Sequence, residues 1–275
     1  MEDGDRRDAC PTPLAPTVSA GDQVASEIYD RLWQEAAAAW ERGEPQTDRC
    51  LSDQANDLRR GVTLALRPSA DVCGKVADYL NHLAQLCPEQ YFYRPEELHV
   101  TVLSIISGSE FWRREMRRLP ACRAIIGEVL SRQHSFTIGF RGVTASPGSV
   151  MIQGFPVDDG LASIRDELRE AFTRAGFGDL LDRRYRISTA HITAMRFRQS
   201  GGNWKRLVSL LEEGRHLHFG ETEVRSLQLL WGDWYASVSH VRTLHEYTLP
   251  ALLPSASQST SRHLLSPISP WKSAL

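Results

Sequence analysis

Two short apolar segments of the sequence each carry one histidine and one threonine, two residues apart. The segment LHVTV contains His99 and Thr101, and the segment AHITA contains His191 and Thr193. Residues i and i+2 of a β-strand point to the same side of a sheet, so each histidine is expected beside its threonine. A single histidine on a strand is usually structural, but two copies with the same spacing and apolar neighbours indicate a shared function.

Two imidazoles that face one cleft can act as a general base and a general acid. The reference pKa of histidine is near ~6.5, so one ring can be neutral while the other is protonated around neutral pH. Such a pair suits in-line attack at phosphorus, and each threonine hydroxyl can donate a hydrogen bond to a non-bridging phosphate oxygen. This chemistry requires no metal, cofactor or covalent intermediate, and a strained 2′,3′-cyclic phosphate is a suitable substrate.

The elements that position the two motifs form a duplicated pattern of strand, helix, loop and strand. The matching segments of the two halves are a strand at 62–66 or 150–155, a helix at 71–86 or 161–177, and a motif strand at 98–106 or 190–197. The stripe along the second helix consists of Leu161, Ile164, Leu168 and Phe172. This repetition is the reason to expect the two motifs to meet.

The rest of the chain supplies further helices and strands. The predicted segments are a helix over 23–42, a helical stretch over 111–130 broken at Pro120, a strand over 136–143 paired with 150–155 across a turn at 145–149, a helix over 203–214, and closing strands in 216–220, 224–232 and 240–249. We expect an α+β fold with two pseudo-symmetric lobes, each an antiparallel sheet backed by helices, around a central cleft. The expected divisions are a disordered leader at 1–20, an N-terminal helical extension at 21–60, a two-lobed domain at 61–250 and a flexible Ser/Pro-rich tail at 251–275.

Composition limits the classes of partner and location. A formal net charge of −2 argues against a protein that binds long duplex nucleic acid, which usually needs a clearly basic face. The five cysteines are scattered without a C-x-x-C pair, so neither a disulfide framework nor a zinc finger is predicted. The sequence has no signal-peptide pattern and no run of about 18 apolar residues, so we expect a soluble, cytoplasmic monomer without membrane association.

The two motifs, in a duplicated α+β chain, resemble those of the 2H (two-histidine) phosphoesterase superfamily, and in particular its 2′-5′ RNA ligase or RNA 2′,3′-cyclic phosphodiesterase branch. The resemblance covers about residues 61 to 250. It implies that His99 and His191 are the acid and base, without deciding which is which, and that Thr101 and Thr193 hold the phosphate. Members often carry an arginine three residues after the second threonine, a position that Arg196 occupies, and this implies a supplementary phosphate contact.

The expected activity is therefore metal-independent cleavage of a 2′,3′-cyclic or 2′-5′-linked phosphodiester in a nucleotide or short RNA. Two alternatives stay open: RNA 2′-5′ ligation by the reverse reaction, and a non-catalytic nucleotide-binding module that keeps the cleft.

Aromatic residues before each motif could form the rim of the cleft. Tyr93 and Tyr185 are the candidates for contacts with a nucleobase, although rings packed on the core beside solvated charges are an equally good interpretation. The pair His216-x-His218 could bind a metal, but no acidic or cysteine partner has a supporting spacing, and a coincidence at a strand edge is favoured. Trp231, Trp234 and Tyr235 are expected to pack around a hairpin turn, and His240 and His245 to be structural or exposed.

Overall fold

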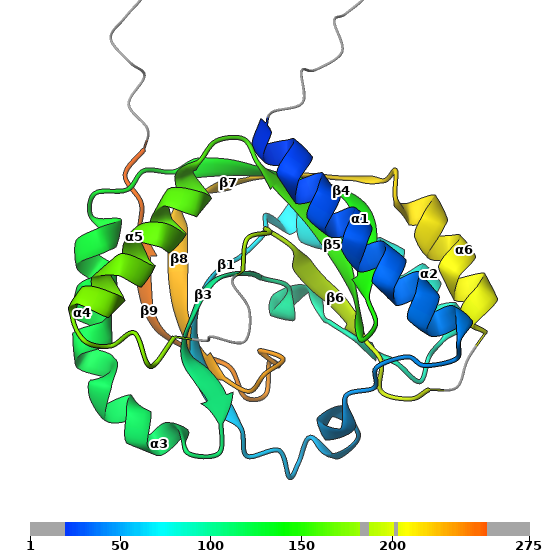
Figure 1. Ribbon diagram of the computed structural model, residues 1–275, viewed down its shortest axis with the longest axis horizontal. Coiled ribbons are helices and arrows are strands. Elements are labelled where there is room, and N and C mark those ends of the chain that lie inside the picture. Colours follow the sequence, from blue (N-terminus) through cyan, green and yellow to red (C-terminus); the bar gives the residue numbers. More distant parts are fainter. Residues whose placement is uncertain (1–19, 182–186, 201–202, 252–275) are drawn as a thin grey trace, which may run out of the picture.

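One strongly curved antiparallel sheet forms the centre of the computed structural model, which describes residues 20–181, 187–200 and 203–251 (Figure 1). The strands are β1 Arg60–Leu66, β2 Tyr91–Phe92, β3 Val100–Ser109, β4 Phe136–Ser146, β5 Ser149–Pro156, β6 Ile192–Arg196, β7 His218–Val224, β8 Ser226–Gly232 and β9 Arg242–Thr248. Their order in the sheet is β7-β4-β5-β6-β3-β1-β8-β9, and the short β2 also pairs with β6. The α+β class expected from the sequence is confirmed.

The two separate sheets expected from the sequence are in fact one continuous sheet. The strands that carry the two motifs, β3 and β6, lie side by side and pair at one residue pair, Val100 with Ile192, while β2 of the first half also pairs with β6. Two separate sheets would each leave a motif strand as an unpaired edge, and pairing these edges satisfies backbone groups that would otherwise lack partners.

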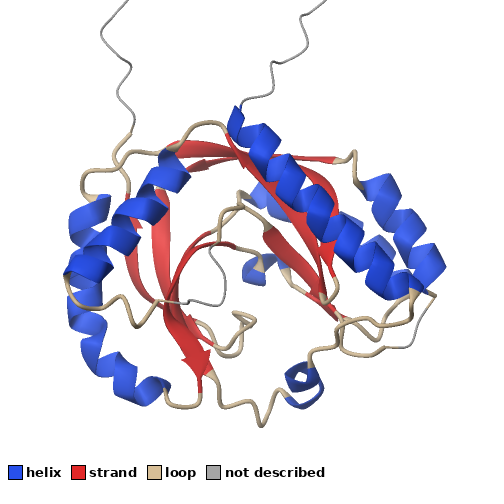
Figure 2. Ribbon diagram, viewed as in Figure 1, coloured by secondary structure: helices blue, strands red, loops and turns tan. Residues whose placement is uncertain are grey.

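Helices cover the outer side of the curved sheet (Figure 2). They are α1 Ala20–Glu41, α2 Ala70–Leu86, α3 Trp112–Glu115, α4 Leu119–Leu130, α5 Gly160–Arg174 and α6 Trp204–Gly214, with short 3-10 turns at Arg49–Asp53, Pro95–Glu97 and Met116–Arg118. The helices α1 and α6 pack on β4, α2 packs on β7, and α5 packs on β3 and α4. The apolar stripe predicted for α5 is buried, which confirms that face of the helix: Leu161, Ile164, Leu168 and Phe172.

The N-terminal helix α1 is part of this packing. Tyr29, Ala36 and Trp40 are buried, and Trp40 stacks on Trp204 of α6. The hydroxyl of Tyr29 donates to the carbonyl of Gly154 in β5 and accepts from the amide of the same residue. Residues 20–41 thus bury side chains against the second half of the sheet.

Other local expectations can be compared with the structure directly. The hairpin between β4 and β5 is confirmed, with Ser146 opposite Ser149. The helical stretch over 111–130 is divided next to Pro120 as expected, and Pro120 occupies the first turn of α4, where a missing backbone N–H costs no hydrogen bond. The expected leader and tail lie almost entirely outside the described residues. Within the described part of the chain, no helix is long and apolar enough to cross a membrane.

Candidate active site

Both His-x-Thr pairs line one pocket. His99 directly precedes β3 and His191 directly precedes β6, so each histidine lies at a strand entrance rather than inside the strand as expected. Val100 is opposite Ile192, and extending this antiparallel register by one residue puts His99 opposite Thr193 and Thr101 opposite His191. The four side chains therefore share one face of the sheet and border a pocket of about 410 Å³.

Each imidazole is held through its Nδ1 atom by the residue two positions earlier. The Nδ1 of His99 lies 2.7 Å from the carbonyl oxygen of Glu97, and the Nδ1 of His191 lies 2.8 Å from the Oγ1 of Thr189. A carbonyl only accepts, so Nδ1 of His99 carries the proton, and the neutral ring has an unprotonated Nε2. The Thr189 hydroxyl can donate or accept, so it can bond His191 in either protonation state.

Desolvation in the pocket favours the neutral form of both rings. Burial lowers the pKa of His99 from 6.5 to about 4, with smaller contributions from the charges of Arg67 and Arg196. Burial likewise lowers the pKa of His191 to about 4, helped by the charges of Arg165 and Arg196 and by His99 itself. Both rings are therefore neutral at pH 7 in the free protein, and an anion between them would raise both pKa values.

The remaining polar groups of the pocket suit an anionic ligand. In the described part of the chain, neither the Thr101 hydroxyl nor the Thr193 hydroxyl has a hydrogen-bond partner, so both are available to a ligand. Arg196 borders the pocket, and its Nε donates to the Tyr93 hydroxyl at 2.9 Å. Tyr93, expected at the rim, borders the pocket with only 4% of its surface exposed. Tyr185, the other expected rim residue, lies outside the described residues.

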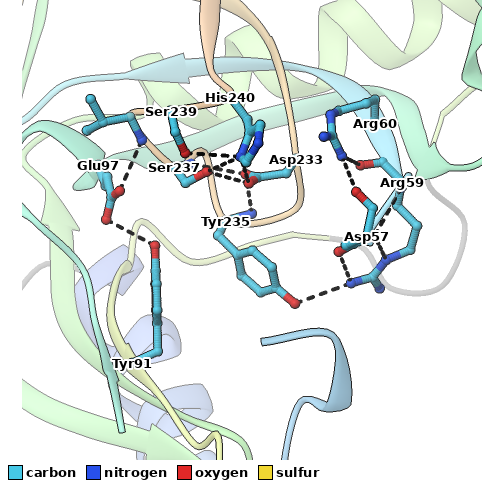
Figure 3. A network of polar contacts seen from close by, with 11 residues as sticks. Asp57, Arg59, Arg60, Tyr91, Glu97, Asp233, Tyr235, Ser237, Ser239 and His240 are labelled. Atoms are coloured by element: carbon cyan, nitrogen blue, oxygen red, sulfur yellow. Dashed lines mark hydrogen bonds and ion pairs between the residues drawn. The ribbon is translucent and has the colours of Figure 1, made fainter. Parts of the chain in front are cut away.

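One wall of the pocket comes from the loop between β8 and β9, residues 233–241. The carboxylate of Asp233 accepts hydrogen bonds from the backbone amides of Tyr235 and Ser237 and lies 3.3 Å from Nδ1 of His240 (Figure 3). Glu97 ties this loop to the His99 segment, because its carboxylate accepts from the Val238 amide and the Tyr91 hydroxyl. The same residue thus orients His99 through its carbonyl and fixes the wall through its side chain.

Part of the pocket lining is apolar. This part includes Leu103 and Ile106 of β3, Leu230 of β8, and Trp234 and Val241 of the loop. Trp234, expected to have only a packing role in the hairpin, therefore has a face on the pocket. A lining that combines apolar side chains with a few polar groups is usual for a site that binds a small organic ligand.

Glu97 and Thr189 are site residues that the sequence reasoning missed. For Thr189 the signal was present, since a side chain two residues before a histidine lies on the same side of an extended chain, whereas Glu97 lies in a 3-10 turn and contacts His99 through its backbone carbonyl. His216 and His218, considered as a metal pair, are exposed and do not border the pocket. Among the described residues, no group of three or more His, Cys, Asp or Glu side chains could hold a metal ion.

Comparisons with known proteins identify the fold. No family model matches the sequence, and no curated protein matches it. The solved structure of TT0787 of Thermus thermophilus is similar with a TM-score of 0.52 and 15% identity, over 70% of this chain and 98% of that chain. Escherichia coli LigT, solved in complex with 3′-AMP, gives a TM-score of 0.49 at 15% identity, over 70% and 98% of the two chains. A protein solved as a phosphoesterase gives 0.45 at 16% identity, over 70% and 99%. At this identity, the similarity to TT0787 concerns the fold alone.

Proposed function

We propose that this protein is a metal-independent phosphodiesterase that acts on 2′,3′-cyclic or 2′-5′-linked phosphodiesters of nucleotides or short RNA. The observation that carries the proposal is the placement of both His-x-Thr pairs on one face of two adjacent strands, around one pocket. Neither motif alone would support it, because acid and base catalysis at phosphorus needs two groups on opposite sides of the reacting atom.

In this mechanism the phosphate lies between the two imidazoles. The unprotonated Nε2 of His99 takes a proton from water as the water oxygen bonds to phosphorus. The protonated His191 gives its proton to the departing ribose oxygen as the P–O bond breaks, and Thr189 accepts from Nδ1 while His191 is charged. Solvent then returns each ring to its starting state.

The hydroxyls of Thr101 and Thr193 donate to the non-bridging oxygens, where negative charge is held in the transition state. Arg196 adds positive charge at the same end of the pocket. Binding an anionic phosphodiester offsets the desolvation of the imidazoles and raises the pKa of the ring that serves as the acid. The bound substrate therefore helps to create the protonation state that its own cleavage requires.

The apolar part of the pocket lining supports a nucleoside as the organic part of the substrate. Leu103, Leu230, Trp234 and Val241 offer a surface on which a nucleobase could be buried while its phosphate reaches the histidines. Arg169 also borders the pocket, and its guanidinium donates to the Ile187 carbonyl. The pocket thus combines an apolar surface with positive charge, as a nucleotide requires.

The test is turnover of three substrates in the presence of EDTA: 2′,3′-cyclic nucleotides, 2′-5′ oligoadenylate, and RNA that ends in a cyclic phosphate. We expect the wild type to cleave at least one of them. His99→Asn and His191→Asn should each lower kcat by about 1,000-fold, the usual contribution of a general acid or base.

His216→Asn is the matched control, because it removes an exposed imidazole outside the pocket. Nucleotide binding without turnover would favour the non-catalytic module over the enzyme. Turnover that EDTA abolishes would contradict the metal-independent mechanism, and turnover that survives both pocket variants would contradict the assigned roles.

A further inference from the structure

A buried arginine of α5, Arg165, lies directly behind the two motif strands. Only 3% of its surface is exposed. Its Nε donates to the Val102 carbonyl at 3.0 Å, and its Nη2 donates to the carbonyls of Thr101 at 2.7 Å and Thr189 at 2.9 Å. Among the described residues, no carboxylate forms an ion pair with this guanidinium. Arginines are rarely buried without such an ion pair, so the hydrogen bonds to the three carbonyls are the main compensation for the desolvation of this charge.

These three carbonyls belong to the two segments that carry the catalytic groups. Thr101 and Val102 are in β3, whereas Thr189 leads into β6 and bonds His191 through its hydroxyl. The backbone ladder joins β3 to β6 at one residue pair alone among the described residues, Val100 with Ile192. The guanidinium therefore supplies a second connection, at the point where the two strands have no further ladder.

We infer that Arg165 is a positioning residue that fixes the distance between the two His-x-Thr pairs. That this distance serves catalysis rests on the proposed function. A guanidinium suits the task because its donors form a planar, rigid fork that reaches several acceptors at once. A lysine at this position would keep the charge, but its single ammonium group on a flexible stem could not hold the same three carbonyls in fixed directions.

The charge of Arg165 also acts on His191. After burial, it is the largest of the influences that lower the pKa of His191, ahead of Arg196 on β6 and of His99 before β3. Arg165 itself faces Arg169 and Asp166 of its own helix and Tyr29 of α1. Charge and geometry can therefore be separated by two substitutions, one of which keeps the charge.

The experiment compares Arg165→Lys and Arg165→Met with the wild type. Arg174→Met is the matched control, since Arg174 is an exposed arginine on the same helix. Thermal unfolding establishes that each variant is folded, kcat and KM are measured with the substrate that the wild type cleaves, and NMR titration gives the pKa of His191. Hydrogen exchange of the amides at 100–102 and 190–193 reports on the connection between the strands without requiring activity.

We expect Arg165→Lys to fold and to lose about 100-fold in kcat with little change in KM, as a displacement of about 1 Å at a reacting group would cause. Exchange at 100–102 and 190–193 should become faster in Arg165→Lys. The pKa of His191 should stay low in Arg165→Lys and rise in Arg165→Met, whereas Arg174→Met should match the wild type throughout.

A folded Arg165→Lys with wild-type kcat and wild-type hydrogen exchange would overturn the inference. If the wild type cleaves none of the substrates, the proposed function fails, and the exchange rates and the His191 titration still decide the role of Arg165. If Arg165→Met does not fold, Arg165→Lys decides it through the exchange rates.

Discussion

Acid should destabilise this protein through the two histidines of its pocket. Burial lowers the pKa of both His99 and His191 from 6.5 to about 4 in the folded chain. The unfolded chain takes up protons on these rings as the pH falls below about 6.5, whereas the folded chain does so only near pH 4. The stabilisation that the neutral rings provide is therefore fully present above about pH 6.5 and is lost as the pH falls from about 6.5 to about 4.

The size of the effect follows from the two pKa values. One pKa unit corresponds to 1.36 kcal/mol. At pH 5 the solution is about 1.5 units below the pKa of a histidine in the unfolded chain, but about one unit above its pKa in the folded chain. Each histidine should therefore lower the free energy of unfolding by about 2 kcal/mol at pH 5 relative to pH 7.5, and the pair by about 4 kcal/mol. A loss of that size is a substantial part of the stability of a typical domain.

Urea unfolding of the wild type and of the double variant His99→Asn/His191→Asn measures this directly. Other groups that titrate between pH 7.5 and pH 5 do so in both proteins. The difference between the two losses of unfolding free energy therefore gives the contribution of His99 and His191. We expect the wild type to lose about 4 kcal/mol more than the double variant between pH 7.5 and pH 5. Equal losses would show that these imidazoles titrate near their ordinary pKa in the fold, and would refute the reasoning from desolvation. The control variant His216→Asn should behave as the wild type.

Three further predictions concern catalysis and packing. Both rings are neutral in the free protein at pH 7, but the mechanism needs one protonated ring. Therefore kcat/KM for a 2′,3′-cyclic nucleotide should increase about tenfold for each unit by which the pH is lowered from 7 to 5, and a flat pH profile in initial-rate assays would contradict this. Thr193→Val should lower kcat by about 100-fold, because a transition-state hydrogen bond is lost, while Thr193→Ser should stay within a few-fold of the wild type. Gly154→Ala should strongly lower the urea midpoint, since a Cβ there would lie 1.9 Å from the Ala190 carbonyl oxygen; Gly74→Ala in α2, where nothing lies within 4 Å, is the control and should not lower it.

The sequence predicted the local elements and the two matched His-x-Thr pairs well, because each of them depends on a short-range pattern. Alternation of apolar residues placed β3 and β6, and the shared spacing in LHVTV and AHITA indicated two matched pairs, which the structure brings to one pocket. The helical stripe of α5 was predicted from residues spaced by three and four. Each motif and each stripe lies within a few residues, and the match between the two motifs is found by comparing two segments of the sequence, so no knowledge of the fold is needed.

The joined sheet and the role of Arg165 could not be predicted in the same way. Whether two strands pair depends on backbone groups far apart in the sequence, and a contact of one residue pair leaves no periodic signal. Arg165 did leave a weak trace, because it lies four residues after Leu161 and three before Leu168, inside the apolar stripe. An arginine at such a position indicates a buried charge, but only the fold identifies the three carbonyls that it holds.

The single residue pair between β3 and β6 has a consequence for biosynthesis. Chain segments made early, including α1 with Tyr29, find their partners only much later, since Tyr29 bonds to a residue 125 positions further on. The pocket between the two His-x-Thr pairs cannot exist until β6 has left the ribosome and closed against β3. Until then β3 lacks its neighbour β6, and contacts this distant in sequence form slowly. The nascent chain should therefore depend on chaperones during synthesis more than its modest size would suggest.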